Sequence, residues 1–206
     1  MIGIFGGTFN PVHYGHLRSA LEVKDIFDLA EIRLIPSANP PHRDLPSVSA
    51  ESRLKMLQLA IDQQTDLKID DRELNRAGPS YMVDTLKSIR SEIGSQPLIL
   101  FIGSDAFNQL TTWHEWQALF NYAHIVVLTR PNYHLQALND FFSVHLSIDR
   151  TELAQNSAGK LYFQSVRQLD ISATAIRDMI AQHKNPGFLL PDKVLTYIRQ
   201  HQLYLR

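Results

Sequence analysis

The apolar residues of this chain gather in short runs, and the runs alternate with stretches in which apolar residues recur every three or four positions. A short continuous apolar run is typical of a strand buried on both faces of a parallel sheet. The runs predict strands at residues 2–5, 31–35, 67–69, 98–102 and 125–128.

The stretches between the runs have the spacing of amphipathic helices. The helices are marked by Leu17, Ala20 and Leu21, by Leu54, Leu57 and Ile61, and by residues 81–89, which follow Ser80 as the predicted N-terminal cap. Strands that alternate with helices predict an α/β fold with a Rossmann-like parallel sheet and helices on both faces. Ligands of such sheets bind at the carboxyl ends of the strands.

The remainder of the chain has a weaker pattern. Residues 131–160 contain Pro, Asn and Ser and are predicted to form an excursion between the sheet and a C-terminal helical part at about 165–206. A chain of 206 residues can bury one substantial core, so we expect a single domain over residues 1–206.

The first sixteen residues, MIGIFGGTFNPVHYGH, combine a strand, a glycine turn and a helix start. Gly6 and Gly7 let a ligand approach the backbone closely, and the helix that opens at Gly15 offers N–H groups to an anion. His13 and His16 are then placed to meet one phosphate. The alternatives to phosphate binding are that the two histidines bind a metal ion or that they are buried in the core. Metal binding is disfavoured because no nearby Cys, Asp or Glu completes a ligand set.

A second candidate segment, LDISATAIRDMI, spans residues 169–180. Ser172 is predicted to cap a helix on which Thr174 and Arg177 share one face. Hydroxyls, helix N–H groups and one permanent positive charge suit a polyphosphate. Taken alone, an ordinary capped helix with a solvated arginine explains the segment better, and only its pairing with the N-terminal motif favours phosphate binding.

Two features of the middle of the chain suit a second nucleotide. The stiff loop formed by Pro40, Pro41, His42 and Arg43 presents donors for a mononucleotide phosphate, although a proline-stiffened surface loop is the better explanation for it in isolation. Trp113 is placed to stack on a pyridine ring, whereas Trp116 is expected in the core.

Composition narrows the substrate class. Lys and Arg total 20 against 21 acidic residues, so no general positive field attracts long nucleic acid, and small nucleotides are favoured. No cysteine is available for a disulfide or a thiolate site. The first apolar run is too short for a signal peptide and no segment is long enough to span a bilayer, so we expect a cytoplasmic protein.

The two terminal motifs together resemble those of nucleotidyltransferases that carry His-x-Gly-His and Ile-Ser-x-Thr-x-x-Arg. Over nearly the whole chain the sequence resembles the bacterial nicotinate-nucleotide adenylyltransferases. The further matching segments are IPSANPPHR (35–43), RELNRAGPSYMVDTL (72–86), GSDAF (103–107), TTWHEW (111–116), TRP (129–131) and LLPDKVLTYIRQHQLY (189–204).

This resemblance implies transfer of AMP from ATP to nicotinate mononucleotide, with Mg²⁺ carried on ATP and no metal held by the protein. It implies catalytic roles for His13, His16 and Arg177. It implies ATP contacts from Gly6, Gly7, Thr8, Phe9, His16, Gly103, Asp105, Ile171, Ser172, Thr174 and Arg177. It implies mononucleotide contacts from Ser37, His42, Arg43, Met82, Trp113 and His114, with the ring against Trp113 and its carboxylate on backbone N–H groups near Met82 and His114. The oligomeric state is left open between monomer and homo-oligomer.

Three positions depart from the family pattern. Asn10 stands where Asp is more common, and we expect it to shape the turn before Pro11 rather than to orient a histidine or influence Mg²⁺. Ala173 replaces a frequent Ser, and Met82 replaces a frequent Thr.

Other function classes fit the sequence less well. Cytidylyltransferases and phosphopantetheine adenylyltransferases share only the terminal motifs. A non-catalytic regulator is expected to lose the histidines or Arg177, and a class I aminoacyl-tRNA synthetase needs a longer chain.

Overall fold

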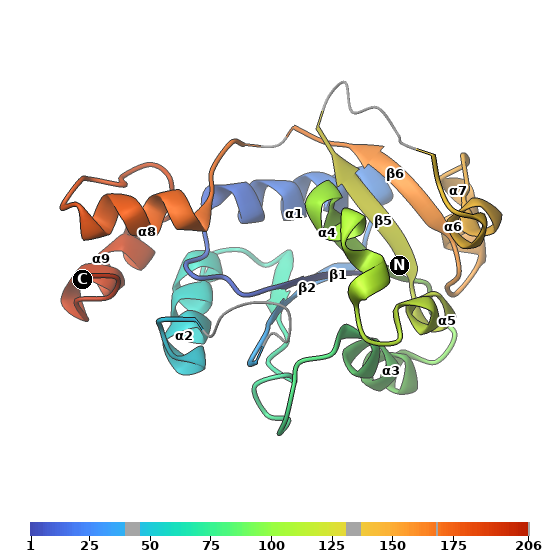
Figure 1. Ribbon diagram of the computed structural model, residues 1–206, viewed down its shortest axis with the longest axis horizontal. Coiled ribbons are helices and arrows are strands. Elements are labelled where there is room, and N and C mark those ends of the chain that lie inside the picture. The colour runs from blue at the N-terminus through green and yellow to red at the C-terminus, as the bar shows by residue number, and fades with distance from the viewer. Residues whose placement is uncertain (40–45, 131–136, 168, 206) are drawn as a thin grey trace.

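The fold is built on six parallel strands (Figure 1). The computed structural model describes residues 1–39, 46–130, 137–167 and 169–205. The strands are β1 (Ile2–Gly7), β2 (Glu31–Pro36), β3 (Leu67–Ile69), β4 (Leu98–Gly103), β5 (His124–Thr129) and β6 (Leu161–Ser165). Their order is β3-β2-β1-β4-β5-β6. The strand order reverses at β1, which pairs with both β2 and β4, and the crevice at such a point is the usual ligand site of an α/β sheet.

The five predicted strands are confirmed, but the sheet has a sixth that the sequence analysis missed. The chain returns to the sheet after the excursion at 131–160, so the part that follows is not wholly helical. Among the strands that the structure describes, β6 pairs only with β5, and an isolated bridge joins Leu161 to Leu146 on its other side. Of the five residues of β6, only Leu161 is fully buried. An edge strand exposed on one side does not need the continuous apolar run that marks a central parallel strand.

Helices cover both faces of the sheet, as predicted. The helices are α1 (Tyr14–Phe27), α2 (Ala50–Ile61), α3 (Met82–Ile93), α4 (Ser104–Asn108), α5 (Leu119–Tyr122), α6 (Asp140–His145), α7 (Thr151–Gln155), α8 (Ala173–Ala181) and α9 (Asp192–Gln200), with short 3₁₀ turns η1 (Leu110–Thr112) and η2 (Trp116–Ala118). Two separate clusters of buried side chains result, one with α1, α2, α8 and α9 and the other with α3, α4 and α5.

The C-terminal helices extend the first of these clusters. α9 packs against α2, and Lys193 of α9 pairs with Asp62 at the end of α2. Figure 1 shows α8 and α9 together at one end of the molecule, next to α2. The last part of the chain is therefore held against the half of the sheet that contains β1.

Ser80 does not cap α3, contrary to the prediction. The N-cap position belongs to Tyr81, whose side chain makes no capping bond. The Ser80 hydroxyl instead accepts hydrogen bonds from the backbone N–H groups of Ala38 (3.0 Å) and Asn39 (3.1 Å). A short polar side chain satisfies any nearby backbone donor, and here the donors belong to the segment after β2. Ser80 thus joins the start of α3 to that segment.

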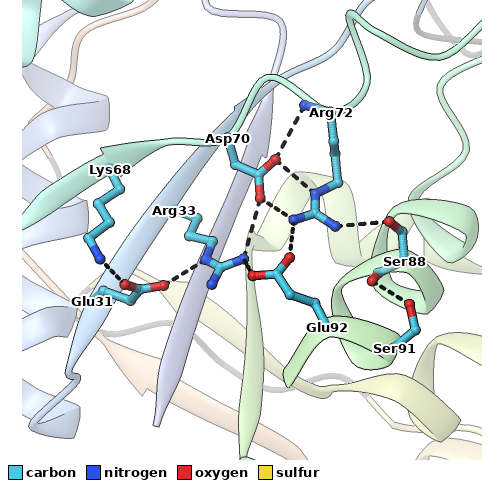
Figure 2. Close-up of polar contacts among 8 residues, drawn as sticks. All are labelled: Glu31, Arg33, Lys68, Asp70, Arg72, Ser88, Ser91 and Glu92. Carbon is cyan, nitrogen blue, oxygen red and sulfur yellow. Dashed lines mark hydrogen bonds and ion pairs between the residues drawn. The ribbon is translucent and has the colours of Figure 1, made fainter. Parts of the chain in front are cut away.

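A network of ion pairs lies beside β2 and β3 (Figure 2). This flank network consists of Glu31, Arg33, Lys68, Asp70, Arg72 and Glu92. Arg72 Nη2 lies 2.6 Å from Asp70 Oδ2 and 2.8 Å from Glu92 Oε2. Burial alone would raise the pKa of Asp70, but its hydrogen bonds and ion pairs with Arg72 and Arg33 hold that pKa below its usual value. Each cation of the flank network is therefore neutralised within the protein.

Candidate active site

The loop after β1 carries the first predicted motif at the carboxyl edge of the sheet. Residues 8–13, called the β1 loop, run from the end of β1 to His13, the N-cap of α1. The peptide bond between Asn10 and Pro11 is cis. Phe9 is buried with a φ of 48°, and its ring contacts that of His16 edge-on. The β1 loop therefore places both predicted histidines at the start of α1.

His13 and His16 form a stacked pair. Their ring centroids are 3.7 Å apart and the rings are inclined by 26°. The backbone N–H of His13 donates to Nδ1 of His16 at 3.3 Å, so a neutral His16 ring carries its proton on Nε2. A side chain at Gly15 would place its Cβ 2.9 Å from Nδ1 of His13. The glycine of the motif is required because the His13 ring occupies the space beside it.

The His13 ring is a neutral group at pH 7. Only 5% of the residue is exposed, and its Nδ1 is buried with no hydrogen-bond partner among the described residues. Burial lowers its pKa from 6.5 to about 4, because the imidazolium form loses its hydration. His13 can therefore form a hydrogen bond with a bound ligand but contributes no positive charge.

Arg177 connects the second motif to the first. Its Nη1 donates to the backbone oxygen of Asn10 at 2.8 Å, and its Nη2 donates to Thr174 Oγ1 at 3.1 Å. Ser172 caps α8 as predicted, because its hydroxyl accepts from the N–H of Ala175 at 3.1 Å. The oxygen of Ile171 lies 3.5 Å from the point that a Cβ on Gly15 would occupy. Segments more than 150 residues apart thus meet at one place.

Ser37 and Met82, two of the residues predicted to bind the mononucleotide, lie directly after β2 and at the start of α3. The N–H of Ser37 donates to the oxygen of Gly7 at 2.9 Å, so the segment after β2 runs beside the β1 loop. Met82 is the first residue of α3, and its methyl group would lie 2.5 Å from a Cβ on Gly6. His42 and Arg43 lie outside the described residues.

The loop after β4 holds the other predicted contacts. Gly103 is the N-cap of α4, with open space where a Cβ would project, and Asp105 is exposed in the first turn. Trp113 is half-buried, and the exposed His114 ring stacks on Tyr81 with centroids 4.2 Å apart. Trp116, expected in the core, packs against Phe141 and Phe142, with centroids 4.8 Å and 5.1 Å away.

Two residues near the first motif escaped the sequence analysis. The hydroxyl of Tyr204 donates to Asn10 Oδ1 at 2.7 Å, and burial raises the pKa of this phenol. Arg53 lies on the buried face of α2, where it precedes Met56 by three residues and Leu57 by four. A charged residue in phase with apolar ones on a helix is a usable signal for Arg53. The sequence around Tyr204 shows no comparable pattern that would mark the tyrosine as a site residue.

The described groups at this place include several hydrogen-bond donors: the imidazoles, the Arg177 guanidinium and the first N–H groups of α1 and α8. Among the residues the structure describes, no group of three or more His, Asp or Glu side chains is arranged to hold a metal ion. Within the same residues, no helix is long and apolar enough to cross a bilayer. Imidazoles, helix N-termini and a guanidinium that lie together beyond the carboxyl end of β1 suit phosphate groups.

The sequence matches the cytidylyltransferase-like family over residues 4–179, and the chain belongs to that family. It is 48% identical over 210 residues to a protein of Methylococcus capsulatus named "Probable nicotinate-nucleotide adenylyltransferase", covering 100% of both chains. A protein of Hahella chejuensis with the same name is 44% identical over 208 residues, covering 98% of this chain and 95% of the relative. The particular family is therefore that of the nicotinate-nucleotide adenylyltransferases, and the resemblance inferred from the motifs is confirmed.

A solved structure shares the fold. Plasmodium falciparum nicotinic acid mononucleotide adenylyltransferase complexed with NaAD superimposes with a TM-score of 0.74, covering 98% of this chain and 96% of that one. The two sequences are 17% identical, so the likeness concerns the arrangement of strands and helices.

Proposed function

We propose that this protein transfers AMP from ATP to nicotinate mononucleotide, giving deamido-NAD and pyrophosphate. The full-length identity to relatives named for this activity supports the proposal. The observation that carries it is the hydrogen bond from Arg177 to the backbone of Asn10, since it places a positive charge on α8 beside the two histidines at the start of α1.

The reaction is one in-line displacement. A phosphate oxygen of the mononucleotide bonds to the α-phosphorus of ATP, and the bond from that phosphorus to the bridging oxygen breaks. Pyrophosphate leaves with the electron pair. The attacking phosphate is already an anion near pH 7, so no general base and no covalent enzyme intermediate is needed. Catalysis depends on alignment and on stabilising the developing negative charge.

The paired histidines and Arg177 divide this work. The Nε2–H of His16 donates to the α-phosphate or the bridging oxygen, and neutral, buried His13 adds a further donor. Arg177 and the N-terminus of α8 bind the departing pyrophosphate. ATP would carry Mg²⁺ on its phosphates, and the ion would neutralise part of their negative charge.

The mononucleotide lies on the β4 side of the crevice in this proposal. Trp113 stacks on the nicotinate ring, and backbone N–H groups near Met82 and His114 receive its carboxylate. Asp105 accepts hydrogen bonds from the adenosine ribose. Ser37 contacts the mononucleotide from the end of β2, and His42 and Arg43 bind its phosphate.

We further propose that residues 1–206 act as one nucleotidyltransferase domain in the cytoplasm, without nucleic acid as a partner. The contact between Arg177 and Asn10 supports the single domain, since α8 completes the site built on β1. The near balance of 20 basic and 21 acidic residues supports small nucleotides as the partners.

A substrate comparison tests the activity. The purified protein is incubated with ATP, Mg²⁺ and either nicotinate mononucleotide or nicotinamide mononucleotide, and pyrophosphate release is measured, with CTP replacing ATP in a parallel series. We expect the fastest release with ATP and the acid. Activity with neither mononucleotide would overturn the proposal, and a preference for the amide or for CTP would overturn the substrate assignment.

A further inference from the structure

Arg53 holds together two loops that belong to different halves of the proposed site. Its Nη1 donates to the backbone oxygen of Thr8 at 2.8 Å and to that of Ser37 at 2.7 Å. Its Nη2 donates to the oxygen of Ala38 at 3.2 Å. Thr8 begins the β1 loop, and Ser37 and Ala38 begin the segment after β2, whose described part (37–39) is called the β2 loop. One guanidinium thus links both loops.

The burial of this charge is unusual for a residue without an acidic partner. Arg53 is 1% exposed, and the structure gives it no carboxylate within ion-pair distance among the described residues. Burial is the main cause of a pKa lowered from the usual arginine value. Its Nε is also buried without a hydrogen-bond partner in the described chain. A buried charge is costly, so the three carbonyl contacts need to compensate for lost hydration.

The two loops begin side by side, because the N–H of Ser37 donates to the oxygen of Gly7 at 2.9 Å, and the proposed function assigns a different substrate to each. Gly6 and Gly7 precede the β1 loop on the ATP side, and Ser37 opens the mononucleotide side. The β2 loop is tied to α3 as well, because Ala38 and Asn39 donate to Ser80, two residues before Met82. Arg53 therefore completes a continuous set of contacts from the β1 loop to the start of α3.

We propose that Arg53 is a positioning residue that fixes the distance between the ATP-binding and mononucleotide-binding loops. The inference rests on the proposed function, since alignment of an attacking oxygen with the α-phosphorus gives the spacing its importance. Reacting atoms need to lie about 3 to 3.5 Å apart, and a misplacement of about 1 Å can cost about 100-fold in rate. Lysine cannot replace arginine here, because one ammonium on a flexible stem does not bridge three carbonyls in a planar geometry.

The chain offers a matched control in Arg90 of α3. Its guanidinium also binds backbone oxygens: those of Gly94, Gln96, Tyr122 and Ser157. These residues surround the amino ends of β4 and β5, at the opposite edge of the sheet from the site. Arg53→Lys and Arg90→Lys therefore disturb the same kind of contact at opposite edges.

The experiment compares wild type with both variants for kcat, the KM of each substrate and the melting temperature. We expect Arg53→Lys to raise KM for both ATP and nicotinate mononucleotide and to lower kcat/KM about 100-fold. Arg90→Lys is expected to lower the melting temperature and leave both KM values unchanged. A folded Arg53→Lys protein with wild-type kcat and KM values, or one whose kcat falls only in proportion to its unfolded fraction, overturns the inference.

Two further measurements keep the inference testable. If Arg53→Lys does not fold, Arg53→Ala is assayed with millimolar guanidinium chloride or ammonium chloride. Faster turnover with guanidinium supports the inference, and equal turnover overturns it. If the wild type releases no pyrophosphate, the proposed function fails separately. Binding of Mg²⁺-ATP then decides the inference: weaker binding by Arg53→Lys supports it, and binding equal to that of the wild type overturns it.

Discussion

The arginines of the flank network and those of the candidate active site bind different kinds of partner. In the flank network, Arg33 and Arg72 both bond to carboxylates (Figure 2). At the site, Arg53 and Arg177 bond to backbone oxygens and one hydroxyl, and among the described residues neither has a carboxylate within ion-pair distance. Both regions adjoin β2, so the contrast is one of chemistry rather than of place in the fold.

The kind of partner decides whether the positive charge of a guanidinium is neutralised within the protein. A carboxylate cancels a full unit of charge, whereas a carbonyl dipole orients a guanidinium and leaves its charge in place. Charges neutralised within the protein stabilise the fold, whereas the proposed function uses the charge of Arg177 to bind an anionic ligand. Substitutions in the two regions should therefore change different measurable quantities.

The largest effect is expected from His16→Ala. Loss of one hydrogen-bond donor to a transition-state oxyanion costs about 2.7 to 4 kcal/mol, or about 100- to 1,000-fold in kcat. The melting temperature should change little, since His16 is only half-buried. Steady-state kinetics and thermal unfolding of the same preparation check both parts. A rate close to wild type would rule out the assigned role.

The buried His13 makes stability depend on pH. In the unfolded chain the ring binds a proton below its ordinary pKa of 6.5, whereas in the folded protein it does so only at about 4. The unfolded state therefore gains protons first, and the free energy of unfolding falls between pH 6.5 and about 4 by up to about 3 kcal/mol.

Urea unfolding across this range measures the effect, with His13→Gln as the matched variant. His124 acts in the same direction because its pKa is also lowered by burial, so His13→Gln should reduce the slope and not abolish it. An unchanged slope would show that His13 keeps its ordinary pKa in the folded protein.

A matched pair, Arg177→Met and Arg72→Met, tests the contrast directly. Removing Arg177 takes charge-assisted bonds from pyrophosphate, each worth about 1.5 to 3 kcal/mol, so KM for ATP should rise about 10- to 100-fold. Removing Arg72 takes one of two cationic partners from Asp70 and Glu92, which keep their ion pairs with Arg33, and should cost about 1 kcal/mol of stability with no change in KM. The contrast fails if Arg72→Met raises KM for ATP as much as Arg177→Met does.

The smallest effect is expected from Tyr204→Phe. The change removes only the hydroxyl that donates to Asn10 Oδ1, and a typical hydrogen bond contributes about 0.5 to 1.5 kcal/mol. We expect a lower melting temperature and a modest rise in KM for ATP, since Asn10 also receives the Arg177 bond. Identical values in variant and wild type would show that the tyrosine does not support the β1 loop.

The predictable parts of the molecule are those with a signature in consecutive residues. The central strands were predicted because a strand buried on both faces is a continuous apolar run, and β6 was missed because only Leu161 within it is fully buried. The family was predicted because its motifs are contiguous, and it is confirmed. The roles of the individual site residues stay predictions.

Contacts with backbone atoms could not be predicted in the same way. Arg53 binds carbonyl oxygens of Thr8, Ser37 and Ala38, and a carbonyl is present at every position whatever its side chain. Ser80 was assigned to the wrong donors for the same reason, because its hydroxyl serves the β2 loop instead of α3. Only the three-dimensional arrangement selects the partner.

The bond between Arg177 and Asn10 has a consequence for the growing polypeptide. On the ribosome, all the strands of the sheet are synthesised before α8, so an unfinished product can carry both histidines and still lack the guanidinium to which we assign the departing pyrophosphate. Such a product also leaves uncovered the apolar surface that α8 and α9 bury in the complete chain. If Arg177 has the proposed role, the active site is completed in the same step of synthesis that buries this apolar surface, and we expect a chain truncated before α8 to be inactive and sensitive to proteases.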